Sequence, residues 1–373
     1  MKWALIGASD IASTRVIPAL RLAGQEILGV MSSNAERAEH YATVHNLLRH
    51  SDQLDELLSW PIDAVYISST NELHASQAIA AAVSGKHILC EKPLTIDLVQ
   101  GAQMVAQAQM HGVVLGTNHH IRASGVHEKI REIVNGGELG DIYLARVNHA
   151  VGLSERLRGW RLSGESQGGG VVWDIVVHNV DTLRADLQSD VVEVTALAAT
   201  GELAQSGIQD LTSCSFRFAN GVIATTCESY LVPFSRTSLE IHGSLGSLVA
   251  IDVLRQDPIG DIIISNSTGR RDVVVEDREN LYVKTIRRFE QACHGNGEPF
   301  STGADGLMAA TCAAGVLISA RDKRTVAISE LTQTLASHLA QGVRKPRNGC
   351  PDSIGTPVRK PPESPQCGHV TLR

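Results

Sequence analysis

Two short stretches of the sequence carry side chains whose types and spacing suit ligand binding and proton transfer. One contains Lys92, a cation at a position where ligands bind. The other follows a triple glycine and contains Asp174, His178 and Asp181, spaced as i, i+4 and i+7. On a regular helix these side chains share one face, where carboxylates favour a charged histidine that donates a proton near neutral pH. The alternative is a polar helix face with an incidental histidine.

The position of Lys92 in the chain favours a role in a ligand site. It lies in Glu91-Lys92-Pro93, directly after the apolar run 87–90, which we read as a buried strand. Ligands bind outside the carboxyl ends of parallel strands, and Pro93 restrains the residue before it to an extended conformation. The pattern therefore predicts a lysine aimed at a ligand, although a surface lysine before a helix-starting proline would look the same.

A glycine-containing turn, Gly7-Ala8-Ser9-Asp10-Ile11-Ala12, follows the first apolar run and opens the first amphipathic one. In this place a turn can hold the pyrophosphate of a dinucleotide on backbone N–H groups. The match to GxGxxG is degraded, because Ser9 and Ala12 replace the second and third glycines. An ordinary turn is the alternative to a cofactor site.

The end of the second apolar run predicts which dinucleotide binds. An NAD site usually has an acidic residue there, but the chain has Ser32 and Ser33, with Arg37 one helical turn further on. Two hydroxyls and a guanidinium suit a 2′-phosphate, which points to NADP(H). The alternative is a helix N-cap followed by an exposed arginine.

These residues need a scaffold, and the first 118 residues predict an α/β Rossmann domain with a doubly wound parallel sheet. Apolar runs that alternate with amphipathic ones indicate buried parallel strands covered by helices on both faces. The expected strands are 3–6, 27–31, 64–67, 87–90 and 113–115. The expected helices are 11–22, 34–45, 73–83 and 96–110.

Residues 119–341 predict a second domain, an α+β substrate or oligomerisation domain with a large, mostly antiparallel open sheet. Strand-like runs fill 142–151 and 191–276, and Asn220-Gly221 between two of them is a hairpin signal. Helices are expected at 126–134, 171–187, 281–294, 303–321 and 328–341. The tail, 342–373, holds six of the 12 prolines and few apolar residues, so it is predicted to be disordered.

Composition and charge exclude several classes of partner. The formal net charge of -7 argues against nucleic acid held by phosphate contacts. We expect no membrane span, since no apolar run reaches the roughly 18 residues that a span needs, and no signal peptide, since Asp10 interrupts the apolar start. Seven cysteines without a CxxC spacing predict reduced thiols in a cytoplasmic protein. His119-His120 lacks HxH or HExxH spacing, so no metal is expected.

Taken together, the motifs resemble the glucose–fructose oxidoreductase/inositol dehydrogenase (Gfo/Idh/MocA) family of NAD(P)-dependent sugar oxidoreductases. The matching pieces are the turn at 7–12, Ser69-Thr70-Asn71-Glu72-Leu73-His74, Glu91-Lys92-Pro93, and Gly169-Gly170 through Asp174 and His178 to Asp181. The chain departs from the family at Ser9, at Ser69-Thr70 where many members have Thr-Pro, and at Val176 where a glycine is usual.

The resemblance implies roles for individual residues. Lys92 would contact nicotinamide and substrate, Asp174 would orient the substrate, and His178 would transfer the proton. His119, Trp160 and Arg161 would line the sugar pocket. The implied cofactor contacts are Gly7, Ala8, Ser9, Asp10, Ile11, Ser32, Ser33, Arg37, Ser69, Thr70, Asn71, His74, Glu91 and Lys92.

The expected function is NADPH-dependent reduction of a small keto-sugar. Two alternatives stay open: another pyranose or inositol dehydrogenase of the same family, or a non-catalytic regulator that binds NADP. The expected partner is a small sugar, and the protein would be a monomer or a homo-oligomer formed through the second-domain sheet.

Overall fold

The first half of the chain builds a parallel sheet. The structure is a computed structural model that describes residues 1–164, 167–204 and 207–342. Six strands pair in the order β3-β2-β1-β4-β5-β6, all parallel, which confirms the predicted Rossmann sheet. The strands are β1 (Lys2–Ile6), β2 (Glu26–Met31), β3 (Arg49–Ser51), β4 (Ala64–Ile67), β5 (His87–Cys90) and β6 (Leu115–Thr117). The short strand β3 has no clear apolar pattern and was absent from the sequence-based prediction.

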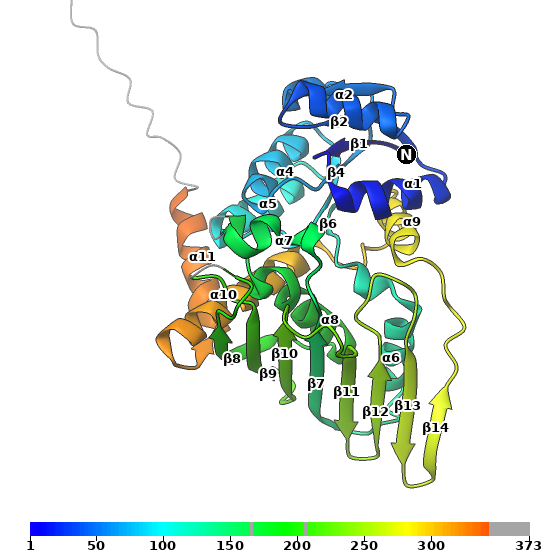
Figure 1. The fold of residues 1–373 in the computed structure, drawn as a ribbon, viewed down its shortest axis with the longest axis vertical. Helices are drawn as coiled ribbons and strands as arrows, with labels where there is room; N and C mark the ends of the chain where they lie inside the picture. Colours follow the sequence, from blue (N-terminus) through cyan, green and yellow to red (C-terminus); the bar gives the residue numbers. More distant parts are fainter. Residues whose placement is uncertain (165–166, 205–206, 343–373) are drawn as a thin grey trace, which may run out of the picture.

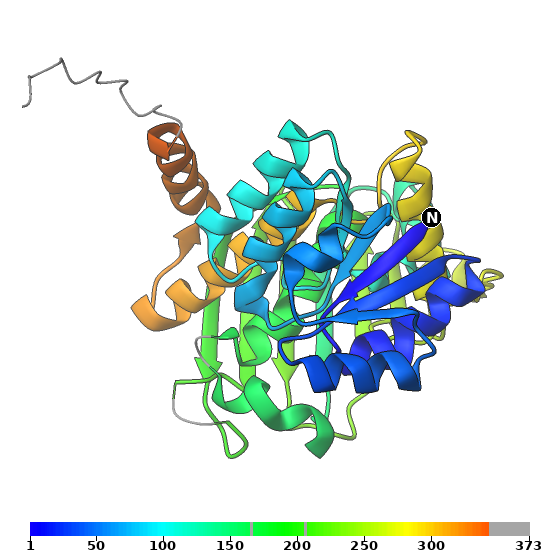
Figure 2. The same ribbon diagram turned by 90° about the horizontal axis from the view of Figure 1, so that it is seen from above.

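Helices cover both faces of this sheet (Figure 2). They are η1 (Ala12–Val16), α1 (Ile17–Leu22), α2 (Ala35–Val44), α3 (Leu54–Leu58), η2 (Asn71–Leu73), α4 (His74–Val83) and α5 (Leu98–Met110). Asn34 caps α2 by accepting a hydrogen bond from the Arg37 N–H, as its residue type favours. The expected first helix is divided into a π-helical turn, η1, and the short α1.

The second half builds a mixed, mostly antiparallel sheet of nine strands, seen below the Rossmann sheet in Figure 1. Its order is β14-β13-β12-β11-β7-β10-β9-β8-β15, and only β7 and β10 pair in parallel among the strands described. The strands are β7 (Ile142–Ala150), β8 (Val191–Ala199), β9 (Leu211–Phe218), β10 (Ile223–Ser229), β11 (Ser238–Gly243), β12 (Gly246–Ile251), β13 (Asp261–Asn266), β14 (Gly269–Val273) and β15 (Val326–Ala327). Asn220-Gly221 joins β9 to β10 as an antiparallel hairpin, as predicted.

Helices of the second half pack against the second sheet, against one another and against helices of the Rossmann domain. They are η3 (His120–Ala123), α6 (Gly125–Asn135), α7 (Glu155–Ser163), η5 (Val172–Val176), α8 (Val177–Leu187), α9 (Leu281–Cys293), α10 (Gly303–Asp322) and α11 (Ile328–Gly342). Helix α9 returns to the Rossmann core, where Phe289 lies against Trp3 with ring centroids 5.3 Å apart. The two sheets are therefore joined by packing as well as by the chain, and a boundary at residue 118 stays a prediction.

Helix α10 corrects the expectation that no apolar run is long enough to cross a membrane. Its Ala- and Gly-rich composition makes it long and apolar enough to cross a membrane by those criteria alone. However, 56% of the apolar window is buried inside the protein, and residues such as Ala309 and Ala313 are fully or almost fully buried. Helix α10 contacts β8 and α8, so its apolar surface serves as core.

Two further expectations concern the C-terminal tail and the cysteines. The predicted disordered tail lies, apart from Gly342, outside the described residues. The described cysteines are all free thiols: Cys90, Cys214, Cys227, Cys293 and Cys312.

Candidate active site

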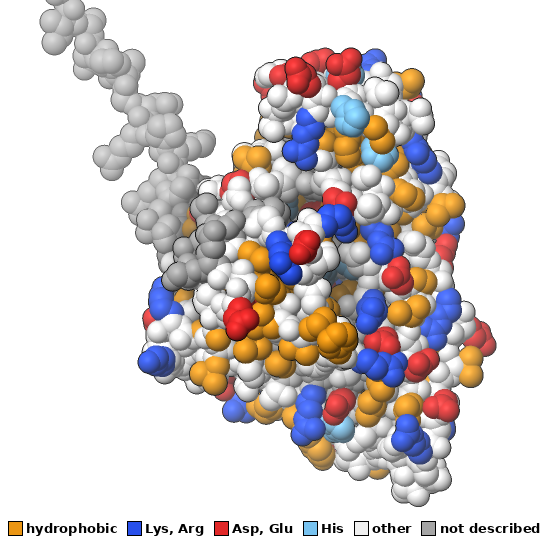
Figure 3. All heavy atoms as spheres, in the orientation of Figure 1, with side chains coloured by type: hydrophobic (Ala, Val, Ile, Leu, Met, Phe, Trp, Pro, Cys, Tyr) orange, Lys and Arg blue, Asp and Glu red, His pale blue; other side chains and the backbone are white. Residues whose placement is uncertain are grey.

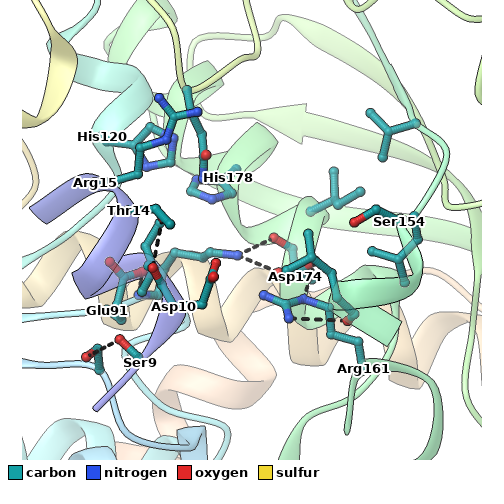
Figure 4. A pocket seen from close by; sticks show the side chains of 18 of the residues that line it. Ser9, Asp10, Thr14, Arg15, Glu91, His120, Ser154, Arg161, Asp174 and His178 are labelled. Carbon is teal, nitrogen blue, oxygen red and sulfur yellow. Dashed lines mark hydrogen bonds and ion pairs between the residues drawn. The ribbon is translucent and has the colours of Figure 1, made fainter. Parts of the chain in front are cut away.

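The Glu-Lys-Pro turn and the triple-glycine segment meet between the two sheets. Lys92, at the carboxyl end of β5, places its Nζ 2.6 Å from Asp174 Oδ1 and 2.9 Å from the Asp174 backbone oxygen (Figure 4). Asp174 Oδ2 accepts from the Tyr230 hydroxyl at 2.8 Å and lies 3.2 Å from Arg161 Nε. Burial alone would raise the pKa of Asp174, but Lys92, Arg161 and Tyr230 together hold it well below its usual range. The carboxylate is therefore ionised, and both of its oxygens have partners.

Asp174 and His178 line the same cleft, but the partners of Asp174 are other residues than His178. Asp174 belongs to the π-helical turn η5, whereas His178 belongs to the α-helix α8 that follows. The two carboxylate oxygens of Asp174 are bonded to Lys92, Arg161 and Tyr230. Asp181, the third expected partner, instead pairs with Arg122, whose Nε lies 2.6 Å from Asp181 Oδ2.

His178 is surrounded by other histidines and a lysine rather than by carboxylates. His119 Nδ1 lies 3.4 Å from His178 Nδ1, and the His120 ring packs edge-on against the His178 ring at 5.1 Å. Burial is the main cause of a pKa well below the usual value for His178, and Lys92, His120 and His119 lower it further. The expectation of a histidine charged near neutral pH is therefore wrong, because the ring is buried among basic groups.

At the predicted dinucleotide turn the backbone of Gly7 lies close to the end of strand β4. Gly7 adopts φ +107°, and a Cβ there would lie 2.7 Å from the Ser69 backbone nitrogen, so only glycine fits. Ser9 Oγ bonds Ser68 Oγ at 2.7 Å and accepts from the Ala12 N–H at 3.1 Å. The turn is thereby fixed against the end of β4 at the start of η1.

The side chains predicted to read the adenosine end lie beside this turn. The Arg37 guanidinium donates to the Ala8 carbonyl at 2.7 Å, and Tyr41 donates to the Ser9 carbonyl at 2.9 Å. Ser32 is buried at the end of β2, whereas Ser33 and Arg37 are exposed. A guanidinium at the surface next to the turn is consistent with a contact to a cofactor phosphate.

Two residues predicted to touch ligands lie behind the site instead. His74 is fully buried, with ring nitrogens 3.0 Å from the Pro93 oxygen and 3.3 Å from the Ser69 oxygen. It therefore joins the Ser69 turn to the Glu-Lys-Pro turn. His119 is 2% exposed and packs behind His178 rather than lining the cleft.

The other predicted residues of these motifs have the following positions. Ser69 donates to Gln77 and Asn71 donates to the Gln167 oxygen, both at the mouth of the cleft. Thr70 bonds the Glu72 carboxylate at 2.7 Å. The side chain of Trp160, in α7, lies outside the described part of the structure.

Glu91 is buried beside Lys92 and accepts hydrogen bonds from Tyr66 and Asn118. Burial raises its pKa, and these hydrogen bonds oppose that shift. The contacts hold the strand end rigid below Lys92.

A cleft of about 760 Å³ joins the dinucleotide turn to the Lys92–Asp174 pair. Its lining includes Ser9, Asp10 and Ile11 of the turn as well as Lys92, Asp174 and His178. Basic and acidic side chains are interspersed over the face of the molecule shown in Figure 3. The arrangement can hold an extended cofactor with its reactive end beside a cation, a carboxylate and a neutral histidine.

Comparison with known proteins gives the family. Residues 1–119 match the model "Oxidoreductase family, NAD-binding Rossmann fold", and residues 127–249 match "GFO/IDH/MocA C-terminal domain". The chain belongs to the Gfo/Idh/MocA family. It is an NAD(P)-binding oxidoreductase of the class that acts on CH–OH or C=O groups.

A curated relative and two solved structures of this family illustrate the likeness. The chain is 42% identical over 307 residues to 1,5-anhydro-D-fructose reductase of Ensifer adhaerens, covering 82% of this chain and 92% of the relative. Aldose-aldose oxidoreductase from Caulobacter crescentus, complexed with glycerol, has a TM-score of 0.81 at 20% identity over 88% of this chain and 99% of that one. Levoglucosan dehydrogenase, complexed with NADH and levoglucosan, has a TM-score of 0.79 at 21% identity over 88% and 98%. The two structures support the fold.

Several residues of this family member's cleft were missed from the sequence. Tyr230 bonds Asp174, and His120 and His149 line the cleft beside His178. Tyr230 follows strand β10, where an alternating pattern gives no sign that a tyrosine reaches a distant aspartate. His149 lies near the end of the strand run 142–151, and a histidine at a buried position of a strand was the available signal.

Two ion pairs connect opposite sides of the cleft. Arg156, in α7, pairs with Asp10 of the dinucleotide turn. Arg15, in η1, lies 2.8 Å from Asp257 in the loop after β12. Asp10 therefore contacts the second half of the chain as well as opening the first helix.

Proposed function

We propose that this protein is an NADPH-dependent reductase of a small keto-sugar, with 1,5-anhydro-D-fructose as substrate and 1,5-anhydro-D-mannitol as product. The observation that carries the proposal is Lys92 held by Asp174 at the end of a cleft that begins at a dinucleotide turn. The 42% identity to 1,5-anhydro-D-fructose reductase over most of both chains supports the choice of substrate.

The turn at Gly7 fits a dinucleotide, because it is kept open and rigid where a Cβ would collide with the backbone of Ser69. Backbone N–H groups at the start of η1 would hold the pyrophosphate, and Arg37 with Ser32 and Ser33 would hold a 2′-phosphate. When bound, NADPH supplies the hydride that reduces the carbonyl carbon. The protein must then stabilise and protonate the carbonyl oxygen.

Lys92 provides the electrostatic part of this task. Its ammonium has three N–H donors, and the two acceptors of Asp174 engage two of them. The third is available for the substrate oxygen as that oxygen gains negative charge. Asp174 fixes the direction of the ammonium and is itself fixed by Tyr230.

His178 provides the proton in this proposal. Its low pKa makes the protonated ring scarce at neutral pH but strongly acidic when it forms. Reduction should therefore accelerate as the pH falls through the neutral range. Arg161, held to Asp174 at the cleft wall, would contact sugar oxygens.

One observation favours a second function within the same family. A neutral His178 beside Lys92 is also ready to accept a proton, which suits oxidation of a pyranose or an inositol. Nothing in the described site favours a non-catalytic regulator, because Lys92, Asp174 and His178 are brought into one cleft.

The experiment is steady-state turnover in both directions. The protein is mixed with NADPH and a panel of keto-sugars, and with NADP⁺ or NAD⁺ and a panel of pyranoses and inositols. Preferred reduction of 1,5-anhydro-D-fructose supports the first function. Turnover confined to oxidation of a polyol would replace it with the second.

A further inference from the structure

A buried histidine lies behind His178 and links it to a carboxylate. His119 Nδ1 lies 3.4 Å from His178 Nδ1, and its other ring nitrogen, Nε2, lies 4.0 Å from Asp181 Oδ1. His119 and Asp181 are buried, whereas His178 lines the cleft. The three side chains form a line that leads from the cleft into the protein core, and proton transfer to the substrate directly involves only its first member, His178.

Asp181 is fixed at the inner end of this line. Arg122 Nε donates to its Oδ2 at 2.6 Å, and Ser301 Oγ donates to its Oδ1 at 3.2 Å. His119 Nε2 is a buried atom without a hydrogen-bond partner among the described residues. At 4.0 Å it is too far from Asp181 for a hydrogen bond, but it is close enough to feel the charge of the carboxylate in a buried environment.

That charge determines which nitrogen of His119 carries the hydrogen. Burial lowers the pKa of His119 to about 4, so its ring is neutral and has one N–H group. A hydrogen on Nε2 points toward the negative charge of Asp181, whereas a hydrogen on Nδ1 would leave the lone pair of Nε2 facing that charge. The first arrangement is favoured, so His119 Nδ1 is an acceptor.

An acceptor at His119 Nδ1 in turn fixes the tautomer of His178. Two facing ring nitrogens form a hydrogen bond only when one carries a hydrogen and the other does not. The neutral His178 ring therefore has its hydrogen on Nδ1, directed at His119, and a bare Nε2. Because His119 occupies the Nδ1 side of the ring, Nε2 is the nitrogen that a substrate in the cleft can reach.

This arrangement reserves one nitrogen of His178 for the proton that is exchanged with the substrate. A proton that binds Nε2 gives an imidazolium whose Nδ1–H stays on His119, and its transfer to a substrate oxygen restores the same neutral tautomer. Neither direction of the reaction requires the ring to turn or to move its other hydrogen. The other groups that face this ring are Lys92, His120 and His149, and all of them disfavour its charged form.

We propose that His119 is a positioning residue for His178: it accepts the hydrogen bond of His178 Nδ1 and, with its own Nε2–H directed at Asp181, keeps His178 Nε2 free for proton exchange with the substrate. The inference rests on the role of His178 in the proposed function. It applies to reduction and to oxidation alike, because both use the same nitrogen.

The first test is kinetic. His119→Phe keeps a ring of similar size but removes both nitrogens, so it should lower kcat by about 10- to 100-fold through poor orientation of His178. Its KM for the substrate should change by less than about 3-fold, because His119 does not line the cleft. His119→Gln should return kcat to within about 5-fold of the wild-type value, since its amide can accept from His178 and donate toward Asp181.

The second test determines the tautomers and needs no turnover. Nitrogen-15 spectra of histidine-labelled protein near neutral pH should show a protonated Nδ1 and an unprotonated Nε2 for His178, assigned by its loss in His178→Gln. His119 should show the reverse. Asp181→Asn should invert both rings, because Arg122 keeps the amide oxygen on its own side and the amide NH₂ then faces His119. Asp305→Asn, which removes another carboxylate paired with Arg122, should leave both tautomers unchanged.

Three results would overturn the inference. They are a wild-type His178 with its hydrogen on Nε2, tautomers that do not change in Asp181→Asn, and a His119→Phe variant with the wild-type kcat. The first two do not involve a variant of His119, so they decide the question even if His119→Phe does not fold.

The tests also separate this inference from the proposed function. If the protein oxidises a polyol and reduces no keto-sugar, the proposed function fails, and the tautomers and the kcat of His119→Phe with that polyol still decide the role of His119. Loss of activity in His178→Gln without any loss in His119→Phe overturns the inference alone. Full activity in both variants overturns the inference together with the proposed role of His178.

Discussion

Lys92 and Asp174 are 82 residues apart in the chain, yet Lys92 Nζ contacts both the carboxylate and the backbone oxygen of Asp174. The lysine comes from the parallel sheet and the aspartate from the helix that packs on the second sheet. Their pair is buried on both sides, with 13% and 14% of the two side chains exposed. It fixes the ammonium at the point where the two halves of the chain face one another.

The pair predicts non-additive kinetics. Lys92→Met should lower kcat by about 10³-fold or more, because no cation then stabilises the negative charge that develops on the reacting oxygen. Asp174→Asn should lower it by about 10- to 100-fold, since the ammonium is then poorly oriented. The double variant should be no slower than Lys92→Met alone, because Asp174 acts through Lys92. Multiplicative losses in a double-mutant cycle would show that Asp174 has an independent role.

His178 predicts the pH dependence of reduction. Its folded pKa is below the usual value, so the protonated fraction rises about tenfold for each unit of pH lowered across the neutral range. We expect kcat/KM for reduction to rise accordingly between pH 8 and 6. His178→Gln should lower kcat by about 10²- to 10⁴-fold and remove the slope, while NADPH affinity stays unchanged.

The control for His178 is His242→Gln, on strand β11 away from the cleft, which should behave as wild type. Two results together would assign proton donation to another group such as Lys92. The first is a kcat/KM of the wild-type protein that does not change with pH, and the second is a His178→Gln variant that keeps more than about a tenth of the wild-type kcat.

Arg37 predicts cofactor choice. Its guanidinium lies at the dinucleotide turn, so Arg37→Ala should raise the KM for NADPH by about 10- to 150-fold and leave that for NADH nearly unchanged. Arg21→Ala, in α1, is the matched control because Arg21 bonds the His45 oxygen away from the turn. Equal use of NADH and NADPH by the wild-type protein would contradict the assignment.

The buried histidines predict that stability falls in mild acid. Burial lowers the folded pKa of His119 and His149 to about 4 and of His120 to about 3, whereas the unfolded chain titrates near 6.5. Between these values the unfolded state binds more protons, so acid favours unfolding. Each of the three should cost about 2 kcal/mol at pH 5 relative to pH 7.5.

Urea denaturation at pH 5 and pH 7.5 measures this cost. Asp305, whose pKa is lowered to about 2, stabilises the fold above about pH 4 and loses that effect only below it, so it does not contribute over this range. His120→Gln should reduce the difference in the free energy of unfolding between the two pH values by the contribution of one histidine. A free energy of unfolding equal at the two pH values would mean that these rings are protonated in the folded state.

The Rossmann sheet and the two reacting motifs could be predicted from the sequence because their signals are local. Apolar strands, the glycine turn and the Asn34 cap each depend on neighbouring residues. The position of Lys92 followed from the rule that ligands bind at the carboxyl ends of parallel strands. These signals do not depend on how the second half of the chain folds.

The protonation of His178 could not be predicted, because it depends on two features that spacing does not carry. Asp174 is bonded to Lys92 and Tyr230, which come from distant parts of the chain, instead of to His178. His120 comes from the segment after β6 and reaches His178 only in the folded chain. Likewise, the contact of Tyr230 with Asp174 depends on how β10 pairs with its neighbouring strands, and a hairpin signal at one end of β10 does not determine that pairing.

The most direct test of the proposed function is to identify the product of one reaction. The purified protein is incubated with NADPH and 1,5-anhydro-D-fructose, cofactor oxidation is followed by absorbance, and the sugar is identified by nuclear magnetic resonance. The proposed function predicts stoichiometric formation of 1,5-anhydro-D-mannitol, with a kcat/KM at least about tenfold above that for other keto-sugars, and loss of turnover in Lys92→Met. No reduction of any keto-sugar, alongside oxidation of a pyranose or an inositol, would contradict it.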